Sequence, residues 1–455
     1  MRSKICLFDD FYVAARPGTV RRFFKPQKLG EFGDGDLLQT YTSFFYDTNV
    51  GKYRLYYEVP VSEKSTEIRK LLMAEAESVE ALIGGNAEKY EVEGLDPNGI
   101  HGCSVLLCSH DDRQYNYVLA GNFHANDRKT RCMFTAHSDD GIHFTDLHQI
   151  YEDYSDCYNS IYYNQYTKEY VITMRASLMD RRIFRICSND LIHWSRPEMI
   201  LHPEADGNNG VQLYAMGVSG ADSMYYGLLW RFVTDMGQPD LSDMYGYMDC
   251  DLYYSYDGSH FMPTGLSPVC DRPVPPEYGC KQLWLLNTCN TPNDRTVICG
   301  GASSLMHGAE IVMKKFATTA FYDIRKDGFC ALEGLGKNST VYLKRFVCDG
   351  DELSVNANAC LGSLSVALLN DKGQPYEGFS FEDCVALTHT DAVDHKITWK
   401  NASLKELIGK SVHIAIRLDG ALLYTVTFDG RPCLRHPQKS TGDLMPTSPI
   451  DHTYG

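Results

Sequence analysis

Several residues in this chain have types and neighbours that suit chemistry on a sugar. Trp230 is followed by Arg231. An aromatic ring beside a cation suits a carbohydrate, because the ring packs on C–H groups while the guanidinium binds hydroxyls or a carboxylate. Asp156 enters an aromatic segment that contains Tyr158 and Tyr162. Such apolar surroundings are expected to perturb the ionisation of its carboxyl group, which is typical of functional sites.

Two other acidic stretches are candidates for the same chemistry. Asp34 and Asp36 lie in the sequence Gly-Asp-Gly-Asp, which suits a functional loop and a solvated turn equally. Glu310 follows a Gly-Ala pair and precedes an apolar segment. In that position it is a candidate proton donor.

The elements that must position these residues are predicted to be strands. Short segments rich in aromatic and β-branched residues recur with turn signals between them, as in Tyr53–Val59 and Tyr225–Phe232. Helical periodicity is confined to Ile68–Leu82 and Leu404–Ile408. The sequence therefore predicts an all-β chain with little helix.

A repeated turn indicates how the strands are organised. The pattern Ser-x-Asp-x-x-His followed by Phe or Trp occurs three times, with Asp140, Asp190 and Asp257 at spacings of 50 and 67 residues. Aspartate and serine satisfy the backbone of a tight turn, and the aromatic residue anchors the returning strand. Repeats at such intervals are typical of propeller blades. The histidines of the pattern are predicted to be structural rather than metal ligands; they are His143, His193 and His260.

Five similar units begin near Tyr41, His101, Asp156, Gln212 and Gln282. We therefore predict a five-bladed β-propeller over residues 1–333, with the segment 70–95 interrupting the outer edge of its first blade. The segments that follow alternate apolar with polar residues, which predicts a β-sandwich domain over residues 334–432. Residues 433–455 contain several prolines without periodicity and are predicted to form a C-terminal arm.

In a propeller, the starts of the innermost strands and the loops between second and third strands open on the same face. This geometry predicts a set of substrate-binding residues around a central funnel: His101, Arg175, Gln212, Tyr214, Trp230, Arg231, Gln282, Trp284 and His307. Interior packing is the alternative for the residues on the strands and for Trp230.

The composition excludes several classes of partner. The chain of 455 residues has 59 acidic and 43 basic side chains, a formal charge of −16, which argues against nucleic acid and anionic membranes. No apolar run approaches the roughly 20 residues of a membrane helix. The first ten residues turn acidic before any signal-like stretch, so a cytoplasmic location is expected. A homo-oligomer is left open.

The cysteines are predicted to be buried free thiols. There are 16 of them, without any Cys-x-x-Cys pair, and many stand in apolar stretches. No phosphate-binding glycine loop is present, and we expect no cofactor and no metal.

The chain resembles glycoside hydrolases of families 32 and 43, and more closely a bacterial group similar to those families. The resemblance rests on the order of several short motifs along nearly the whole chain. These motifs are Phe-Asp-Asp-Phe at 8–11, Tyr-Asp at 46–47, the three Ser-x-Asp turns, Tyr-Ser-Asp at 154–156 and Asp-Glu-Leu at 351–353. It implies a five-bladed propeller followed by a sandwich. It is more specific for architecture than for chemistry.

In the resembled families, three acidic groups come from the starts of the first three inner strands. The resemblance places a base or nucleophile at Asp34 or Asp36 and an acid at Asp156. At the second position the sequence has His101, and the Arg-Asp-Pro pattern of the families is absent. Their Glu-Cys signature for the general acid is also missing, which leaves Glu310 as the alternative donor.

The leading hypothesis is therefore an exo-acting glycoside hydrolase that cleaves a small oligosaccharide or glycoside with carboxylate acid–base chemistry. Two alternatives remain. One is a non-catalytic carbohydrate-binding propeller, which the missing patterns favour. The other is a sialidase-like hydrolase, which a cluster of three arginines in the funnel would favour.

Overall fold

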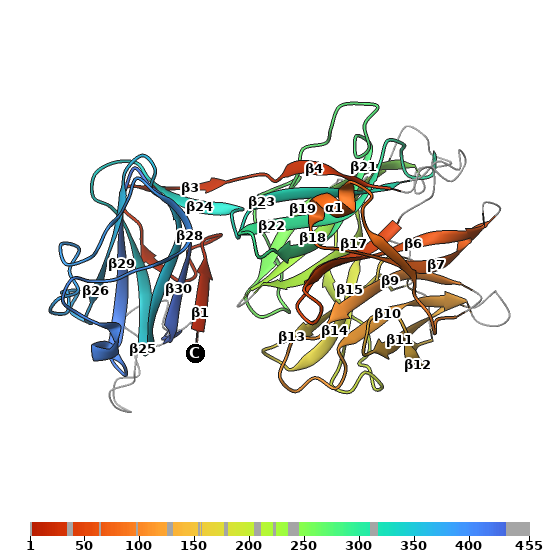
Figure 1. The fold of residues 1–455 in the computed structure, drawn as a ribbon, viewed down its shortest axis with the longest axis horizontal. Coiled ribbons are helices and arrows are strands. Elements are labelled where there is room, and N and C mark those ends of the chain that lie inside the picture. Colours follow the sequence, from red (N-terminus) through yellow and green to blue (C-terminus); the bar gives the residue numbers. More distant parts are fainter. Residues whose placement is uncertain are drawn as a thin grey trace. The chain divides into compact units, whose positions relative to one another are not determined.

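The computed structural model describes residues 2–33, 40–62, 65–96, 99–124, 131–152, 155, 157–176, 181–203, 211–221, 224–234, 245–309 and 317–433. The chain divides into two compact units, one of Lys25–Ile324 and the other of Met1–Phe24 with Arg325–Gly455. Strands dominate both units (Figure 1). The chain is therefore nearly all β, as the sequence predicts. The first residues belong with the C-terminal unit, whereas the sequence analysis assigned residues 1–333 to one domain.

The described strands of Lys25–Ile324 form three sheets of eight, four and eight strands, within which they fall into five antiparallel groups of four. Single residue pairs, Arg69 with Ile100 and Met248 with Gln282, join the first group to the second and the fourth to the fifth. Group 1 contains β5 (Thr40–Asp47), β6 (Lys52–Ser62), β7 (Ser65–Ala76) and β8 (Glu88–Glu91). Group 2 contains β9 (Ile100–Leu107), β10 (Tyr117–His124), β11 (Arg131–Ser138) and β12 (Thr145–Tyr151). Group 3 contains β13 (Ser160–Asn164), β14 (Glu169–Met174), β15 (Ile183–Ser188) and β16 (Glu198–Leu201). Group 4 contains β17 (Val211–Ala221), β18 (Met224–Thr234), β19 (Gly246–Ser255) and β20 (Met262–Pro263).

Group 5 takes its outermost strand from the other end of the sequence. It contains β21 (Gln282–Asn290), β22 (Arg295–Ser303) and β23 (Thr318–Arg325), and β23 pairs with β4 (Gln27–Phe32). This pairing ties the start of the unit to its end. It completes the last group of four strands.

Consecutive groups pack face to face through apolar side chains. Leu55 and Tyr57 of group 1 pack with Phe321 of group 5, whereas Tyr56 on the opposite face packs with Tyr117 of group 2. Groups 2 and 3 share a further buried cluster, as do groups 3 and 4. The first strands also contact one another in order, β5 with β9, β9 with β13, β13 with β17, β17 with β21 and β21 with β5. These contacts form a closed cycle of five.

A glycine permits the close approach of groups 2 and 3. Gly102 has a φ of +66°, and a Cβ there would lie 2.0 Å from the carbonyl oxygen of Cys157. The Asn159 backbone N–H donates to the Gly102 carbonyl at 2.9 Å. A side chain at position 102 would therefore push β9 away from the segment that enters β13.

The repeated Ser-x-Asp-x-x-His turn has the same hydrogen bonds in each copy. In the last copy, Asp257 accepts from the backbone N–H of His260 at 2.8 Å and from the Ser255 hydroxyl at 3.0 Å. Its second oxygen lies 2.7 Å from Nδ1 of His260, whose side chain is 84% exposed. The turns at Asp140 and Asp190 have matching contacts. These histidines therefore stabilise turns, as the sequence predicts.

We expect Asp257→Ala to lower the free energy of unfolding by about 1–2 kcal/mol, because several donors lose one acceptor. Burial opposes ionisation of Asp257, but the hydrogen bonds from His260 and Ser259 outweigh it and lower its pKa. The carboxylate therefore adds stability above its unfolded pKa, and this stability is lost as the pH falls through the folded pKa. Urea unfolding at pH 7 and pH 3 measures this. A difference between wild type and variant that does not shrink at pH 3 would contradict the assignment.

The region predicted to be helical in group 1 is mostly strand. Within Ile68–Leu82, residues up to Ala76 belong to β7, and only α1 (Val79–Ile83) is helical. β7 pairs with β6 on one side and β8 on the other, so sheet pairing overrides the local periodicity. β8 lies within the segment 70–95 and completes group 1 where the sequence predicted an interruption.

The C-terminal unit is built on one ten-stranded sheet. Its strands are β1 (Arg2–Cys6), β2 (Val13–Ala15), β3 (Thr19–Phe23), β24 (Cys330–Gly334), β25 (Ser339–Asn358), β26 (Ser363–Leu369), β27 (Leu387–Thr388), β28 (Asp391–Lys396), β29 (Ser411–Asp419) and β30 (Leu422–Pro432). The long β25 pairs with β29 and β30, and its second half also pairs with β28. Fully buried residues of these strands, including Leu353, Val366, Ile414 and Val426, share one core. The segment Leu404–Ile408, which the sequence predicts to be helical, contains the 3₁₀ turn η1 (Leu404–Leu407). The predicted arm falls almost entirely outside the described residues.

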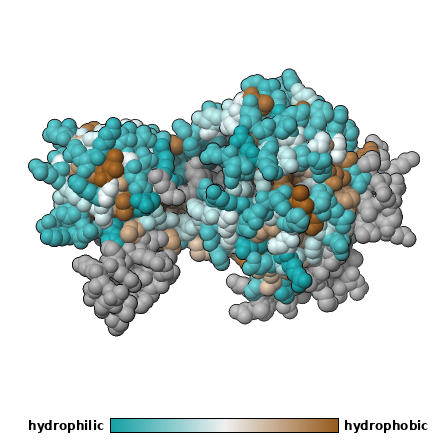
Figure 2. Space-filling view, turned by 90° about the horizontal axis from the view of Figure 1, so that it is seen from below, coloured by the Kyte–Doolittle hydropathy of each residue, from teal (hydrophilic) through white to brown (hydrophobic). Residues whose placement is uncertain are grey.

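The polarity of the surface and the free state of the cysteines agree with what the composition predicts. The face in Figure 2 is mainly hydrophilic, with small separate hydrophobic areas. The 16 cysteines are free thiols, and most are buried. In the part of the chain that the structure describes, no helix is long and apolar enough to cross a membrane.

Candidate functional site

Aromatic rings from several groups meet near the starts of the first strands. Tyr41, at the start of β5, stacks on Trp230 of β18 with ring centroids 6.1 Å apart and planes within 4°. It also stacks on Tyr158, which precedes β13, and meets His101 of β9 edge-on at 5.0 Å. Tyr41 has a φ of +45°, a strained conformation for a bulky residue, and such strain tends to occur at functional sites.

Cations surround a second aromatic residue of the same cluster. Tyr214 of β17 stacks on Trp230 at 6.1 Å, and its hydroxyl lies 3.1 Å from Nε2 of His307. The guanidinium groups of Arg175 and Arg181 lie 4.6 and 5.2 Å from the centre of its ring. Aromatic rings in this cluster therefore contact both other rings and guanidinium groups.

We call this set the central cluster: Tyr41, Arg69, His101, Tyr158, Arg175, Arg181, Tyr214, Trp230, Trp284 and His307. Each of the five groups, or the loops between its strands, contributes to it. Trp230 and Tyr158 are each 1% exposed and form its inner layer. Its partly exposed members are Tyr41, Arg69, His101, Arg181 and His307. These can contact a ligand, while the buried rings hold them in place.

Six of the predicted binding residues belong to the central cluster: His101, Arg175, Tyr214, Trp230, Trp284 and His307. Trp230 is also a packing residue, because its Nε1–H donates to the Leu285 carbonyl at 2.7 Å. Trp284 lies beside it at 6.4 Å and is 6% exposed. Gln212 adjoins the cluster, since its side-chain oxygen accepts a hydrogen bond from Arg181.

Two of the predicted binding residues lie elsewhere. Arg231 donates to the Ser267 hydroxyl at 2.6 Å and lies 3.4 Å from a carboxylate oxygen of Asp251, so it belongs to a separate polar network. Gln282 is 1% exposed, and its amide donates to the Leu305 carbonyl at 2.9 Å. For Gln282, interior packing is therefore what the structure shows.

The four predicted catalytic carboxylates, Asp34, Asp36, Asp156 and Glu310, lie outside the described residues. Ser155 and Cys157, on either side of Asp156, are fully buried. The Ser155 hydroxyl accepts from the backbone N–H of Arg175 at 3.1 Å. Ser155 is thus anchored next to Arg175, a member of the central cluster.

Glu58, within β6, is a residue that no sequence pattern singled out. Its side chain is fully buried. One carboxylate oxygen accepts from the Cys103 backbone N–H at 2.7 Å, and the other lies 3.7 Å from Arg69 and 3.9 Å from Nδ1 of His101. The signal that could have found it is one acidic residue inside the apolar run Leu55–Val59.

The environment of Glu58 favours its neutral form. Burial raises its pKa to about 7, although the charge of Arg69 and the hydrogen bonds from Cys103 act in the opposite direction. A carboxyl group with a pKa near 7 gains or loses its charge when the pH varies around neutrality. Arg69, which lies beside Glu58, is 5.8 Å from the centre of the Tyr41 ring, so the charge of Glu58 changes next to the central cluster.

A separate cavity of about 340 Å³ lies between β11, β12 and the Asp190 turn. Tyr115 in its wall already stacks on His137 at 3.6 Å. None of its lining residues belongs to the central cluster. Within the described ranges, no group of three or more His, Cys, Asp or Glu side chains could hold a metal.

No family model and no curated protein matches the chain. Solved structures similar to it include a family 32 β-fructofuranosidase from Bombyx mori, at 12% identity and a TM-score of 0.42, covering 90% of this chain and 94% of that one. An α-L-arabinofuranosidase from Fusarium graminearum has 11% identity and a TM-score of 0.42, covering 68% and 99%. An N-acetylgalactosamine deacetylase from F. plautii has 10% identity and a TM-score of 0.47, covering 69% and 97%. Glycoside hydrolases, which the sequence resemblance leads us to expect, are thus among these structures.

Proposed function

We propose that this chain is a glycoside hydrolase that acts at the end of a small oligosaccharide or on a simple glycoside. The observation that carries the proposal is the central cluster, in which rings and cations from all five strand groups meet. Aromatic faces pack on the C–H surface of a sugar, and arginine and histidine hydrogen-bond its hydroxyls. Clustered side chains of this kind suit a carbohydrate better than they suit an apolar ligand.

The proposal includes the architecture. Five groups of four strands, with first strands in a closed cycle of contacts, support a five-bladed propeller. A strand from the start of the unit completes the last group, which supports closure of such a ring. The ten-stranded sheet of the C-terminal unit and its single core support a β-sandwich.

The proposed chemistry uses three carboxyl groups, two of them ionised and one protonated. Asp156 and one of Asp34 and Asp36 are the essential carboxylates, and Glu310 is the proposed donor. The donor gives its proton to the leaving oxygen as the glycosidic bond breaks, and water supplies hydroxide to the anomeric carbon and a proton to the enzyme. Tyr41, His101 and the arginines of the central cluster orient the sugar.

A panel of aryl glycosides, short fructosides and arabinosides tests the function. Release of aryl alcohol or monosaccharide identifies a hydrolase. Sugar binding without turnover over days would select the non-catalytic binding protein instead.

We expect Asp156→Asn to lower kcat/KM at least about 100-fold, because a positioned acid or base contributes about that factor or more. The measurement is the rate on the best substrate of the panel, with circular dichroism to show that the fold is retained. Asp139→Asn, an exposed substitution in the first Ser-x-Asp turn, is the control and should keep the wild-type rate. Hydrolysis by Asp156→Asn at the wild-type rate would exclude this residue.

A sialidase-like hydrolase is the second candidate, and one observation favours it. Arg69, Arg175 and Arg181 all lie against rings of the central cluster. Several guanidinium groups suit a sugar that carries a carboxylate. Adding an aryl sialoside to the panel separates the two candidates, because only the sialidase-like enzyme would cleave it.

A further inference from the structure

Glu58 joins two strand groups directly behind the central cluster. It lies within β6 in group 1, and its first oxygen accepts a hydrogen bond from the Cys103 backbone N–H of group 2 at 2.7 Å. Its second oxygen is directed between Arg69 of β7 and His101 of β9, at 3.7 and 3.9 Å. The carboxyl group is 0% exposed, so these contacts occur in a medium that screens charge poorly.

Both basic residues beside Glu58 also contact Tyr41. His101 meets the ring of Tyr41 edge-on at 5.0 Å, and the Arg69 guanidinium lies 5.8 Å from its centre. The side chains of Arg69 and His101 are 12% and 14% exposed, so each has a small accessible surface. Glu58 therefore lies behind three partly exposed residues of the cluster, where it can hold them without touching a ligand.

We propose that Glu58 is a positioning residue of the carbohydrate site: as a carboxylate it holds His101 and Arg69 against Tyr41, and when protonated it releases them. This inference rests on the proposed function, because it assigns the three held residues to sugar binding. It adds a control of that site by pH. The described titratable and charged groups that face Glu58 are Arg69 from β7 and His101 and Cys103 from β9.

The charge of Glu58 changes in the range where the effect can be measured. Burial raises its pKa to about 7, so it is mostly neutral at pH 5.5 and mostly ionised at pH 8. The hold on His101 and Arg69 is therefore expected above neutral pH and weakened below it.

The first test compares Glu58→Gln with wild type on a cleaved glycoside. At pH 8 we expect KM to rise about tenfold with little change in kcat, because the ligand-contacting residues lose their support. At pH 5.5, where the wild-type group is protonated, the two proteins should approach each other. Glu58→Asp should restore part of the affinity at pH 8. Equal KM values for wild type and Glu58→Gln at pH 8 would overturn the proposal.

Glu75→Gln is the matched control. Glu75 is also a buried carboxylate in group 1, but it pairs with Lys52 and Arg54, outside the central cluster. A loss of stability alone would affect both variants. We expect the KM of Glu75→Gln relative to wild type to stay the same at pH 5.5 and pH 8. A KM rise at pH 8 in both variants alike would assign Glu58 a general structural role.

The second test requires no substrate, so it separates failure of this inference from failure of the proposed function. The imidazole NMR signal of His101 is identified by its absence in His101→Asn. In wild type it should show, besides any titration of the imidazole itself, a step near pH 7 that follows Glu58, and in Glu58→Gln this additional step should be absent. Identical titration curves in the two proteins would refute the coupling, even for an active hydrolase. If the step is present but no glycoside is cleaved, Glu58 controls a binding site.

Discussion

Replacing Arg54 by Met is expected to lower the free energy of unfolding of this protein by about 3–5 kcal/mol, the usual effect of removing one partner of a buried ion pair. Arg54 is 4% exposed and lies between two carboxylates that are themselves buried, Asp47 and Glu75. Met fills a similar volume but leaves Asp47 without its cation and Glu75 with Lys52 alone. Urea unfolding followed by tryptophan fluorescence measures the change.

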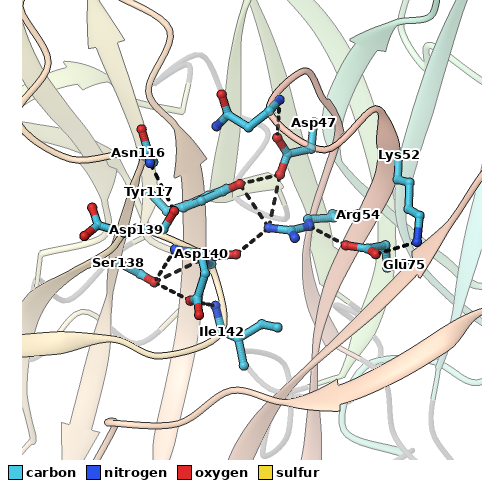
Figure 3. Close-up of polar contacts among 12 residues, drawn as sticks. Asp47, Lys52, Arg54, Glu75, Asn116, Tyr117, Ser138, Asp139, Asp140 and Ile142 are labelled. Carbon is cyan, nitrogen blue, oxygen red and sulfur yellow. Dashed lines mark hydrogen bonds and ion pairs between the residues drawn. The ribbon is translucent and has the colours of Figure 1, made fainter.

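The expected effect is large because Arg54 also joins two strand groups (Figure 3). Within group 1 its Nε donates to Glu75 at 2.8 Å, and its Nη1 lies 3.1 Å from Asp47. Nη1 also donates to two acceptors of group 2, the Tyr117 hydroxyl at 3.0 Å and the Asp140 carbonyl at 2.7 Å. The Tyr117 hydroxyl in turn donates to Asp47. Loss of one guanidinium therefore leaves acceptors unsatisfied in both groups.

Arg295→Met is the matched control for Arg54→Met. Arg295 pairs with Asp323 at 2.6 Å, but its side chain is 44% exposed, so water can replace the arginine. Exposed pairs of this kind contribute about 0–1 kcal/mol. Equal destabilisation by the two substitutions would show that burial of the Arg54 network adds nothing.

Much of the architecture was accessible from sequence because it repeats. The Ser-x-Asp-x-x-His turn satisfies its own backbone within six residues, so local sequence encodes it completely. Its three copies mark the turn between the third and fourth strands of groups 2, 3 and 4. The central rings were accessible in part, since Tyr214 and Trp230 stand out in their segments. The stacking of Trp230 on Tyr41 was not, because it joins strands far apart in the sequence.

Other features depend on long-range pairing that local patterns do not encode. β4 completes group 5 by pairing with β23, about 290 residues later, and the sequence of residues 27–32 does not identify that partner strand. β7 has helical periodicity but is held as a strand by neighbours on both sides. Trp230 and Arg231 are adjacent in sequence yet belong to different networks, because successive side chains of a strand point to opposite faces. The role of a single residue such as Glu58 depends on its contacts with Arg69 and His101, which other strands supply.

The stability of this protein should also depend on pH through Glu58, independently of any substrate. In the unfolded chain a glutamate has a pKa near 4.5, whereas burial raises that of Glu58 to about 7 in the folded protein. Between these values the unfolded state releases its proton first, so the stabilisation present below pH 4.5 is lost as the pH rises to 7. At about 1.4 kcal/mol per pH unit, the contribution of Glu58 to the free energy of unfolding should fall by about 3 kcal/mol over this range.

Glu58→Gln cannot titrate, so its free energy of unfolding, subtracted from that of wild type at each pH, isolates this contribution. The difference should decline between pH 4.5 and 7.5 and then stay constant. Glu75→Gln should give the opposite dependence: burial of Glu75 is outweighed by hydrogen bonds from Lys52 and Arg54, which lower its pKa. Its stabilisation is therefore present at neutral pH and is lost as the solution becomes acidic. Two buried carboxylates of one sheet would thus respond to pH in opposite directions. Glu75 has two cations within hydrogen-bonding distance, whereas the basic side chains beside Glu58, Arg69 and His101, lie at 3.7 and 3.9 Å. Parallel unfolding curves for wild type and Glu58→Gln across this range would mean that Glu58 is ionised in the folded protein at pH 5, and that Arg69 and His101 neutralise it more effectively than their distances indicate.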